Sequence, residues 1–241
     1  MADKETVIKG VRAAFERERE INLHRYPIRM DYRDGDLTLE GEVKSVAAKK
    51  LAMELAIAVP GVSIIVDRLR VEPAVRMGDG AILDAVRDAL IEETVLQNCA
   101  LRVKSKGQSE LVREALLEPS GSIEISVEDG VVLLDDRVTN LIQKRLAGVL
   151  AWWVPGSRDV INGVEVDPPE VDRDDLVTEA VRVVLEKDRF VHADHIRVSV
   201  KNYVVTLDGV ARTETEKRMA ENDAWYVFGV DKVVNHLTVQ R

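Results

Sequence analysis

The sequence predicts an α+β protein built from three tandem units, each with the order helix, strand, strand, helix, strand. The first observation behind this prediction is a pair of marker residues, 20 positions apart, that occurs three times: Gly41 and Gly61, Asp136 and Gly156, Gly209 and Gly229. The other is an apolar stripe upstream of each pair, with the i, i+1, i+4, i+7, i+8 spacing of one helix face, starting at Val7, Ile82 and Leu176. Such repetition indicates internal duplication.

The first two strands of each unit are expected to form a hairpin. Asp34-Gly35 and Asp129-Gly130 each separate two alternating runs, and Asp-Gly is a strong hairpin signal because both residues accept a positive φ. In the third unit, Ile196–Val200 and Tyr203–Val210 alternate, which places the turn at Lys201-Asn202.

The second helix of each unit is expected to end at a glycine, after Pro60, Pro155 and Phe228. Asp136 stands where the other copies have glycine, and aspartate tolerates a left-handed backbone better than most residues. The residues predicted to make structural turns are Gly35, Gly41, Gly61, Gly130, Gly156, Gly209 and Gly229.

The last strand changes its apolar parity at Asp67-Arg68, Asn162-Gly163 and Asn235-His236. A β-bulge and a simple exposed Asx residue explain this equally well. Each unit is expected to hold a three-stranded mixed sheet with two helices on one face. Its second and third strands should be parallel. The other face of the sheet must be covered or polar, and a neighbouring unit is the obvious cover.

The strand DGDLTLEGEV with Gly41, the amphipathic helix after it and the ending VPGV–VDRLRV resemble the BON domain family (bacterial OsmY and nodulation). The segment KNYVVTLDGV…FGVDKVVNHLTV resembles it equally well, and the middle copy less so. The resemblance covers nearly the whole chain, and its motif contains no catalytic residue. It implies an association with phospholipid surfaces and with osmotic or envelope stress, and, for some cytoplasmic relatives, with potassium binding.

The predicted units are residues 1–74, 78–167 and 170–241, with linkers at Pro73–Gly80 and at Asp167–Glu170. The second unit carries an insertion of about twenty residues near 105–122, judged by the repeat period. Within it, QSELVREALLEPSG is expected to be a short helix with Leu111, Ala115 and Leu116 on one side. This helix would either cover the core of its own unit or make a specialised contact.

The net charge of −9 is uneven along the chain. Residues 1–75 hold 13 basic and 13 acidic side chains, residues 76–169 hold 10 and 16, and residues 170–241 hold 11 and 14. Because an acidic surface repels phosphate backbones, nucleic acid is not an expected partner. No apolar run is long enough for a transmembrane segment, and the N-terminal segment lacks the apolar core of a signal peptide. With a single cysteine, Cys99, these features predict a cytoplasmic protein.

Two groups of residues are candidates for binding. Lys9, Arg12, Arg17 and Arg19 form a basic concentration that could contact an anionic lipid or acidic partner, although interleaved glutamates also fit a solvated face. Trp152, Trp153 and Trp225 are candidate aromatic contacts, and they equally suit the core and the contacts between units.

No catalytic constellation, cofactor motif or metal site is predicted. His192 and His195 are three residues apart, but they lie in an expected loop without a third ligand nearby. The expected function is therefore that of a non-enzymatic binding or adaptor protein that contacts phospholipid surfaces or a cation such as potassium. The alternative is a structural protein-protein interaction module that self-assembles or docks to a partner protein.

Overall fold

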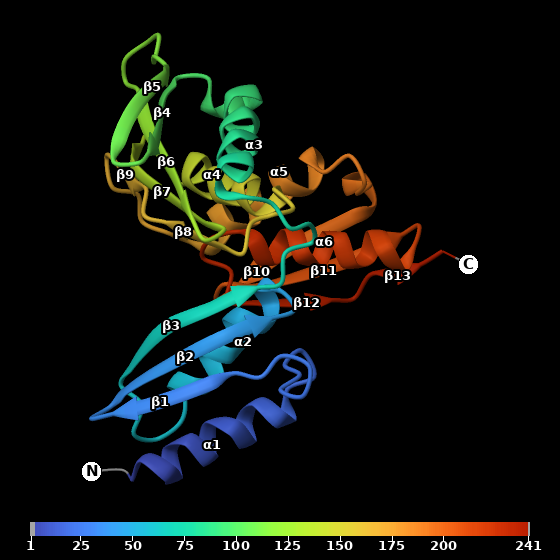
Figure 1. The fold of residues 1–241 in the computed structure, drawn as a ribbon. Coiled ribbons are helices and arrows are strands. Elements are labelled where there is room, and N and C mark those ends of the chain that lie inside the picture. The colour runs from blue at the N-terminus through green and yellow to red at the C-terminus, as the bar shows by residue number, and fades with distance from the viewer. Residues whose placement is uncertain (1–2, 241) are drawn as a thin grey trace. The chain divides into compact units, whose positions relative to one another are not determined.

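A computed structural model describes residues 3–240 (Figure 1). The α-helices are α1 (Lys4–Arg17), α2 (Val46–Ile57), α3 (Asp79–Glu92), α4 (Leu141–Trp153), α5 (Asp174–Lys187) and α6 (Glu214–Tyr226). The short 3-10 helices are η1 (Thr94–Leu96) and η2 (Ala193–His195). The strands are β1 (Arg29–Arg33), β2 (Asp36–Val43), β3 (Ile64–Val71), β4 (Cys99–Ser105), β5 (Gln108–Arg113), β6 (Gly121–Glu128), β7 (Val131–Val138), β8 (Asp159–Asn162), β9 (Glu165–Val166), β10 (Ile196–Lys201), β11 (Val204–Ala211), β12 (Lys232–Asn235) and β13 (Thr238–Val239).

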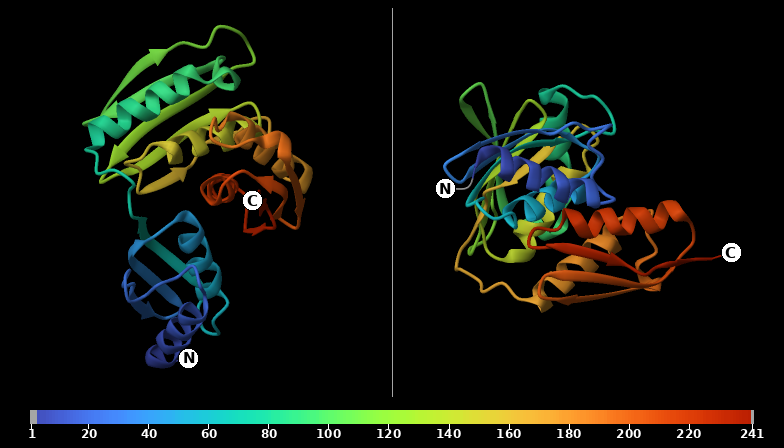
Figure 2. Two further views of the ribbon diagram at one scale, coloured as in Figure 1. Left: turned by 90° about the vertical axis from the view of Figure 1, so that its right-hand side faces the viewer. Right: turned by 90° about the horizontal axis from the view of Figure 1, so that it is seen from below.

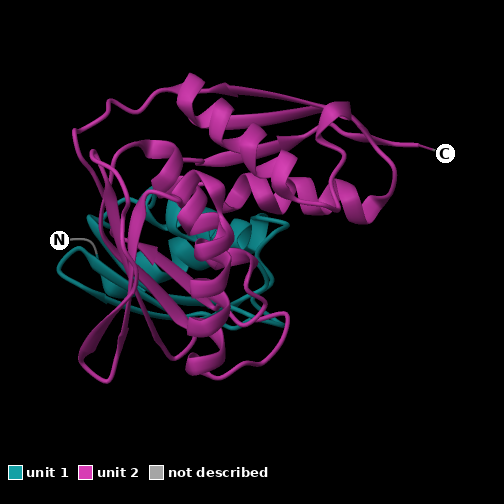
Figure 3. Ribbon diagram, turned by 90° about the horizontal axis from the view of Figure 1, so that it is seen from above, with its two compact units in different colours: residues 1–72 teal, residues 73–241 magenta. Residues whose placement is uncertain are grey.

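The chain divides into two compact units (Figure 3). Unit 1 extends to Glu72 and contains the first repeat. Unit 2 begins at Pro73 and contains the other two, which we call the second repeat (α3 to β9) and the third repeat (α5 to β13). The α+β class and the three mixed sheets are as predicted.

Unit 1 has the predicted three-stranded sheet, in the order β1-β2-β3. Strand β1 is antiparallel to β2, and β3 is parallel to it. Val7, Val11 and Phe15 of α1 are buried in one core with Leu37 and Leu39, the alternate residues of β2. The predicted helical stripe and the period-two strand pattern thus meet in a single core, as burial of both apolar faces requires.

The second repeat departs from the three-stranded prediction because its sheet has six strands, in the order β5-β4-β6-β7-β8 with β9 also on β7. The extra strands are β4 and β5, which lie between η1 and β6. The predicted inserted helix is wrong. Gln108–Arg113 is strand β5, antiparallel to β4, and forms the outer edge of the sheet (Figure 2). The apolar residues of this segment have helical spacing, but the segment forms a strand because the edge of β4 has backbone groups that need hydrogen-bond partners.

In the third repeat, β10 is antiparallel to β11, and β12 and β13 are parallel to it. The hairpin turn is Asn202-Tyr203, with φ of 50° and 61°, one residue later than predicted. Asp174 accepts hydrogen bonds from both turn amides, at 2.8 and 3.0 Å. These two bonds stabilise a left-handed conformation that a tyrosine rarely adopts.

The last strand is interrupted in two of the three copies. In the second repeat it breaks after Asn162 and in the third after Asn235, and the buried Val164 and Leu237 occupy the breaks. Strand β3 is instead continuous and pairs in register with β2 along its whole length. The parity change therefore marks an irregularity in the second and third repeats only.

The second and third repeats pack through their helices, which lie between the two sheets of unit 2 (Figure 3). The expectation that a neighbouring repeat covers the open sheet face is therefore wrong within unit 2. Leu133 and Ile161, paired across β7 and β8, remain partly exposed on that face. The buried stripe of α5 also differs from the prediction: it consists of Val177, Ala180, Val181, Val184 and Leu185, while Leu176 is only half-buried.

Six of the seven predicted turn glycines have φ between 75° and 150°, and Gly156 is the exception. A side chain at Gly209 would place its Cβ 2.1 Å from the carbonyl oxygen of His195. Asp136, at the equivalent position of the second repeat, has a φ of 83°. The second repeat thus keeps the backbone geometry without the glycine.

Candidate functional site

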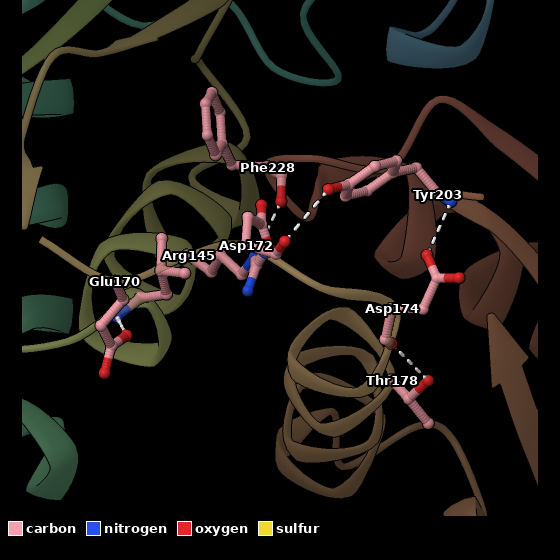
Figure 4. A network of polar contacts seen from close by, with 8 residues as sticks. Arg145, Glu170, Asp172, Asp174, Thr178, Tyr203 and Phe228 are labelled. Carbon is pink, nitrogen blue, oxygen red and sulfur yellow. Dashed lines mark hydrogen bonds and ion pairs between the residues drawn. The ribbon is translucent and has the colours of Figure 1, made fainter. Parts of the chain in front are cut away.

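A buried arginine joins the second repeat to the third (Figure 4). The Nη2 of Arg145, on α4, donates to both carboxylate oxygens of Asp172 at 2.6 and 2.7 Å. Its Nε donates to the carbonyl oxygen of Phe228 at 2.9 Å, and its side chain is 0% exposed. Both bonds to Asp172 come from one nitrogen, and charge-assisted bonds of this kind are stronger than neutral ones. The residues at the equivalent positions, Lys50 and Arg218, are not fully buried, so only the packing distinguishes Arg145.

The predicted tryptophans lie in or near this junction. The indole Nε1 of Trp153 donates to Asp223 Oδ1 at 2.8 Å, and the ring of Trp152 stacks on that of Tyr226 with centroids 5.8 Å apart. Trp225 is buried. Trp152 and Trp153 thus connect α4 to α6. Burial raises the pKa of Tyr226 to about 12, with a smaller contribution from Asp223.

The predicted basic residues are all exposed on or just beyond α1, where Lys9 pairs with Glu5 at 2.8 Å. Arg12, Arg17 and Arg19 have no ion pair within residues 3–240. They therefore remain a candidate anion contact of unit 1.

A lysine recurs at one position of the second helix in every repeat, and it has a structural role in two of them. The ammonium of Lys49 donates to the carbonyl oxygen of Leu69 at 3.0 Å, and that of Lys217 donates to the equivalent carbonyl of Leu237. Lys144 instead lies over the ring of Phe228, 4.6 Å from its centroid. Burial lowers the pKa of Lys144, followed by repulsion from Arg145.

The two neighbouring histidines belong to the fold of the third repeat. His192 Nδ1 lies 2.8 Å from Glu216 Oε1, and the His192 amide donates to the same oxygen. Burial acts to raise the pKa of Glu216, but hydrogen bonds from the amides of His192 and Arg212 outweigh it, so the pKa is lowered. Within residues 3–240, no three His, Cys, Asp or Glu side chains are grouped to hold a metal ion.

The insertion carries an exposed apolar feature on a loop and not on the predicted helix. The segment 114–120, which we call the leucine loop, connects β5 to β6 and carries Leu116 and Leu117, which are 84% and 72% exposed. The amides of both leucines donate to the side-chain oxygen of Asn98. The predicted helix placed Leu116 on one side with Leu111 and Ala115, but Leu111 lies in β5 and Leu116 in the loop.

No helix within residues 3–240 has both the length and the apolar character needed to cross a bilayer.

Solved structures similar to this chain include the C-terminal domain of CdsD, a structural protein of the type III secretion system of Chlamydia trachomatis. It is 14% identical, with 100% of each chain covered and a TM-score of 0.26. A second CdsD structure is 16% identical, with 98% of this chain and 92% of that chain covered and a TM-score of 0.25. The PrgH periplasmic domain is 8% identical, with 90% and 96% covered and a TM-score of 0.24. These TM-scores are too low to support an inference.

No curated protein matches the chain. The BON domain matches three segments, residues 3–73, 101–168 and 173–241. The third segment contains the Asn202-Tyr203 hairpin, and the second begins inside β4. The chain therefore belongs to the BON domain family and carries three tandem copies of the domain.

Proposed function

We propose that this protein is a non-enzymatic adaptor that binds a partner protein. Membership of the BON family supports a non-catalytic binding module. The observation that carries the protein-binding part is the open edge of β3 in unit 1. Within residues 3–240, this eight-residue strand pairs only with β2.

The open edge of β3 also carries exposed aliphatic side chains. Ile64 and Val66, on the same face of the strand, are 56% and 37% exposed. Near the end of β3, the amide of Leu69 donates to Asp67 Oδ1 at 2.9 Å and its carbonyl accepts from Lys49 and Arg70. The open part of the edge is therefore the first half of the strand, around Ile64 and Val66. There, an added strand can pair with the backbone while its side chains contact the same face.

The corresponding strands of the other repeats are less suited to such pairing. Both are broken after the first four residues, at Asn162 and Asn235. Irregularities of this kind limit edge-to-edge pairing in natural sheets. Among the last strands of the three repeats, β3 is therefore the one that is long and regular.

Affinity capture with the full chain tests this proposal. The tagged protein and the double variant Ile64→Glu, Val66→Lys are each incubated with extract of the native host. We expect proteins held by the unchanged chain to be lost from the variant, with circular dichroism showing that both are folded. Retention of the same proteins by both would contradict the use of the β3 edge.

An anionic phospholipid surface is the second candidate partner, because Arg12, Arg17 and Arg19 are exposed and have no ion pair within the described residues. Arginines near an anionic surface each contribute about 1 kcal/mol of attraction. Co-sedimentation with phosphatidylglycerol vesicles tests it. The fraction of protein that pellets with the vesicles should fall at high salt and in the double variant Arg12→Glu, Arg17→Glu. A pelleted fraction that neither change lowers would exclude this site.

A further inference from the structure

The leucine loop presents apolar side chains on an ordered backbone. Asn98, just before β4, makes four hydrogen bonds to it. Its Oδ1 accepts from the amides of Leu116 and Leu117 at 3.1 and 2.8 Å, and its Nδ2 donates to the carbonyls of Leu117 and Pro119 at 2.8 and 3.0 Å. Because these bonds involve only the loop backbone, they hold the leucines outward without using their side chains. The entropy of ordering the loop is therefore largely lost on folding rather than on binding.

A second anchor holds the entrance to the loop. The guanidinium of Arg113, the last residue of β5, donates to the backbone carbonyls of Cys99, Ile91 and Leu96. Its Nε–Cys99 bond is 3.1 Å and its Nη1–Ile91 bond is 3.0 Å. This side chain is thus directed at the body of the second repeat. Neither anchor covers the two leucines.

The charges that flank the leucines in the chain are acidic. Glu114 and Glu118 are exposed, and Glu118 accepts from the hydroxyl and the amide of Ser120. The nearest basic residue in sequence, Arg113, is directed inward. On the neighbouring strand β4, the exposed Arg102 pairs with Leu111, and Lys104 and Lys106 lie toward the other end of the β4–β5 hairpin, about 17 Å away at the rise of a strand.

We propose that the leucine loop is a docking site for a partner protein with an apolar pocket edged by lysine or arginine. This inference rests on the proposed adaptor function and gives the chemistry of the partner. An apolar anchor surrounded by charge of one sign selects a pocket with the opposite rim. Glu114 and Glu118 would repel an anionic bilayer, so a protein pocket is the occupant that the charges favour.

Site-specific photo-crosslinking tests the proposal in the native host. A crosslinking side chain replaces Leu117 in the full chain, since Asn98 bonds only the backbone there. The matched control places it at Val171, which is 80% exposed in the segment before α5. We expect a protein crosslink from position 117 that position 171 does not give, and the captured protein is then purified for titration.

Titration with that protein decides the chemistry. Leu116→Asp should weaken binding at least ~10-fold, as loss of a central apolar anchor does, whereas Val171→Asp should leave it unchanged. Glu114→Lys with Glu118→Lys should weaken binding at low salt, and the difference should shrink at high salt. Asn98→Ala should weaken binding while keeping the leucines, which separates the ordered backbone from the apolar contact.

Other outcomes overturn the proposal. Crosslinks from position 117 only to lipid or to a second copy of the chain, or none above the control, would exclude a protein pocket at the loop. An affinity that Glu114→Lys with Glu118→Lys leaves unchanged would exclude a basic rim on the partner's pocket. If a crosslinker at Ile64 captures a protein and position 117 does not, the adaptor function stands and the loop site fails. If neither position captures one, both fail.

Discussion

The hydrogen bond of 2.8 Å from Trp153 Nε1 to Asp223 Oδ1 joins α4 of the second repeat to α6 of the third through a carboxyl group that is 3% exposed. Burial, together with the carboxylate of Asp188, raises the pKa of Asp223 to about 8. The unfolded chain has an ordinary aspartate pKa of ~3.9, so the folded protein binds the proton more tightly. The bond from Trp153 acts in the opposite direction and lowers the pKa, so burial and Asp188 are what keep the proton on Asp223.

We predict that Asp223→Asn changes how stability depends on pH. The contribution of a protonated Asp223 is complete below pH ~4 and is lost as pH rises through about 8, because only the folded state holds the proton in between. At pH 9, the free energy of unfolding of the asparagine variant should therefore exceed that of the unchanged protein. The excess should be more than ~1.4 kcal/mol, which corresponds to a pKa difference of one unit between the folded and unfolded states. Urea unfolding between pH 5 and 9 measures this. Asp175→Asn, on the exposed side of α5, is the control, and equal pH profiles for all three proteins would refute the prediction.

We predict that Arg145→Ala loosens the second repeat from the third. The change removes the ion pair and leaves Asp172, itself 28% exposed, without its cation. Breaking a buried pair costs ~3–5 kcal/mol, and the partial exposure of Asp172 favours the lower end. Arg218→Ala, at the equivalent exposed position of the third repeat, should cost less than ~0.5 kcal/mol. Calorimetry measures both, and similar effects of the two substitutions would contradict the role of Arg145.

Lys49→Met tests the recurring lysine in unit 1. The buried ammonium pairs with Asp67 at 2.9 Å and donates to the Leu69 carbonyl. Its loss removes both interactions and leaves Arg70 as the other donor to that carbonyl. We expect a loss of ~1–3 kcal/mol in the free energy of unfolding. Lys9→Met removes an exposed pair with Glu5 and should change it by less than ~1 kcal/mol. Denaturant titration followed by circular dichroism compares them, and a neutral Lys49→Met would show that the ammonium is dispensable.

The close approach at Gly209 predicts opposite signs for two glycine substitutions. Gly209→Ala should destabilise the protein by more than ~1–2 kcal/mol, because its φ of 127° is strained for alanine and the new Cβ would meet the His195 carbonyl. Gly80→Ala, in α3 with no atom within 4 Å of the new Cβ, should stabilise by up to ~1 kcal/mol. Thermal unfolding of both variants measures the contrast, and a harmless Gly209→Ala would contradict the geometry.

The repeat could be predicted because its determinants are local and periodic. The stripe starting at Val7 and the alternation around Leu37 each identify one face of one element, and Asp34-Gly35 has positive φ at both residues, as the hairpin prediction requires. The prediction of an inserted helix failed because contacts with residues distant in the sequence outweighed the local pattern. Leu111, Ala115 and Leu116 of the insertion have helical spacing, yet Leu111 lies in β5, which pairs with β4, and Leu116 lies in the loop held by Asn98.

The sequence by itself determined that the chain is three copies of one small α+β module, since side-chain periodicity and turn residues act over a few positions. Only the tertiary structure decided that the helical faces of the second and third repeats meet, that Arg145 is buried while Arg218 is not, and that Leu116 and Leu117 point into solvent. Each of these depends on residues far along the chain, such as Phe228 for Arg145. Contacts of that range leave no spacing in the sequence by which to recognise them.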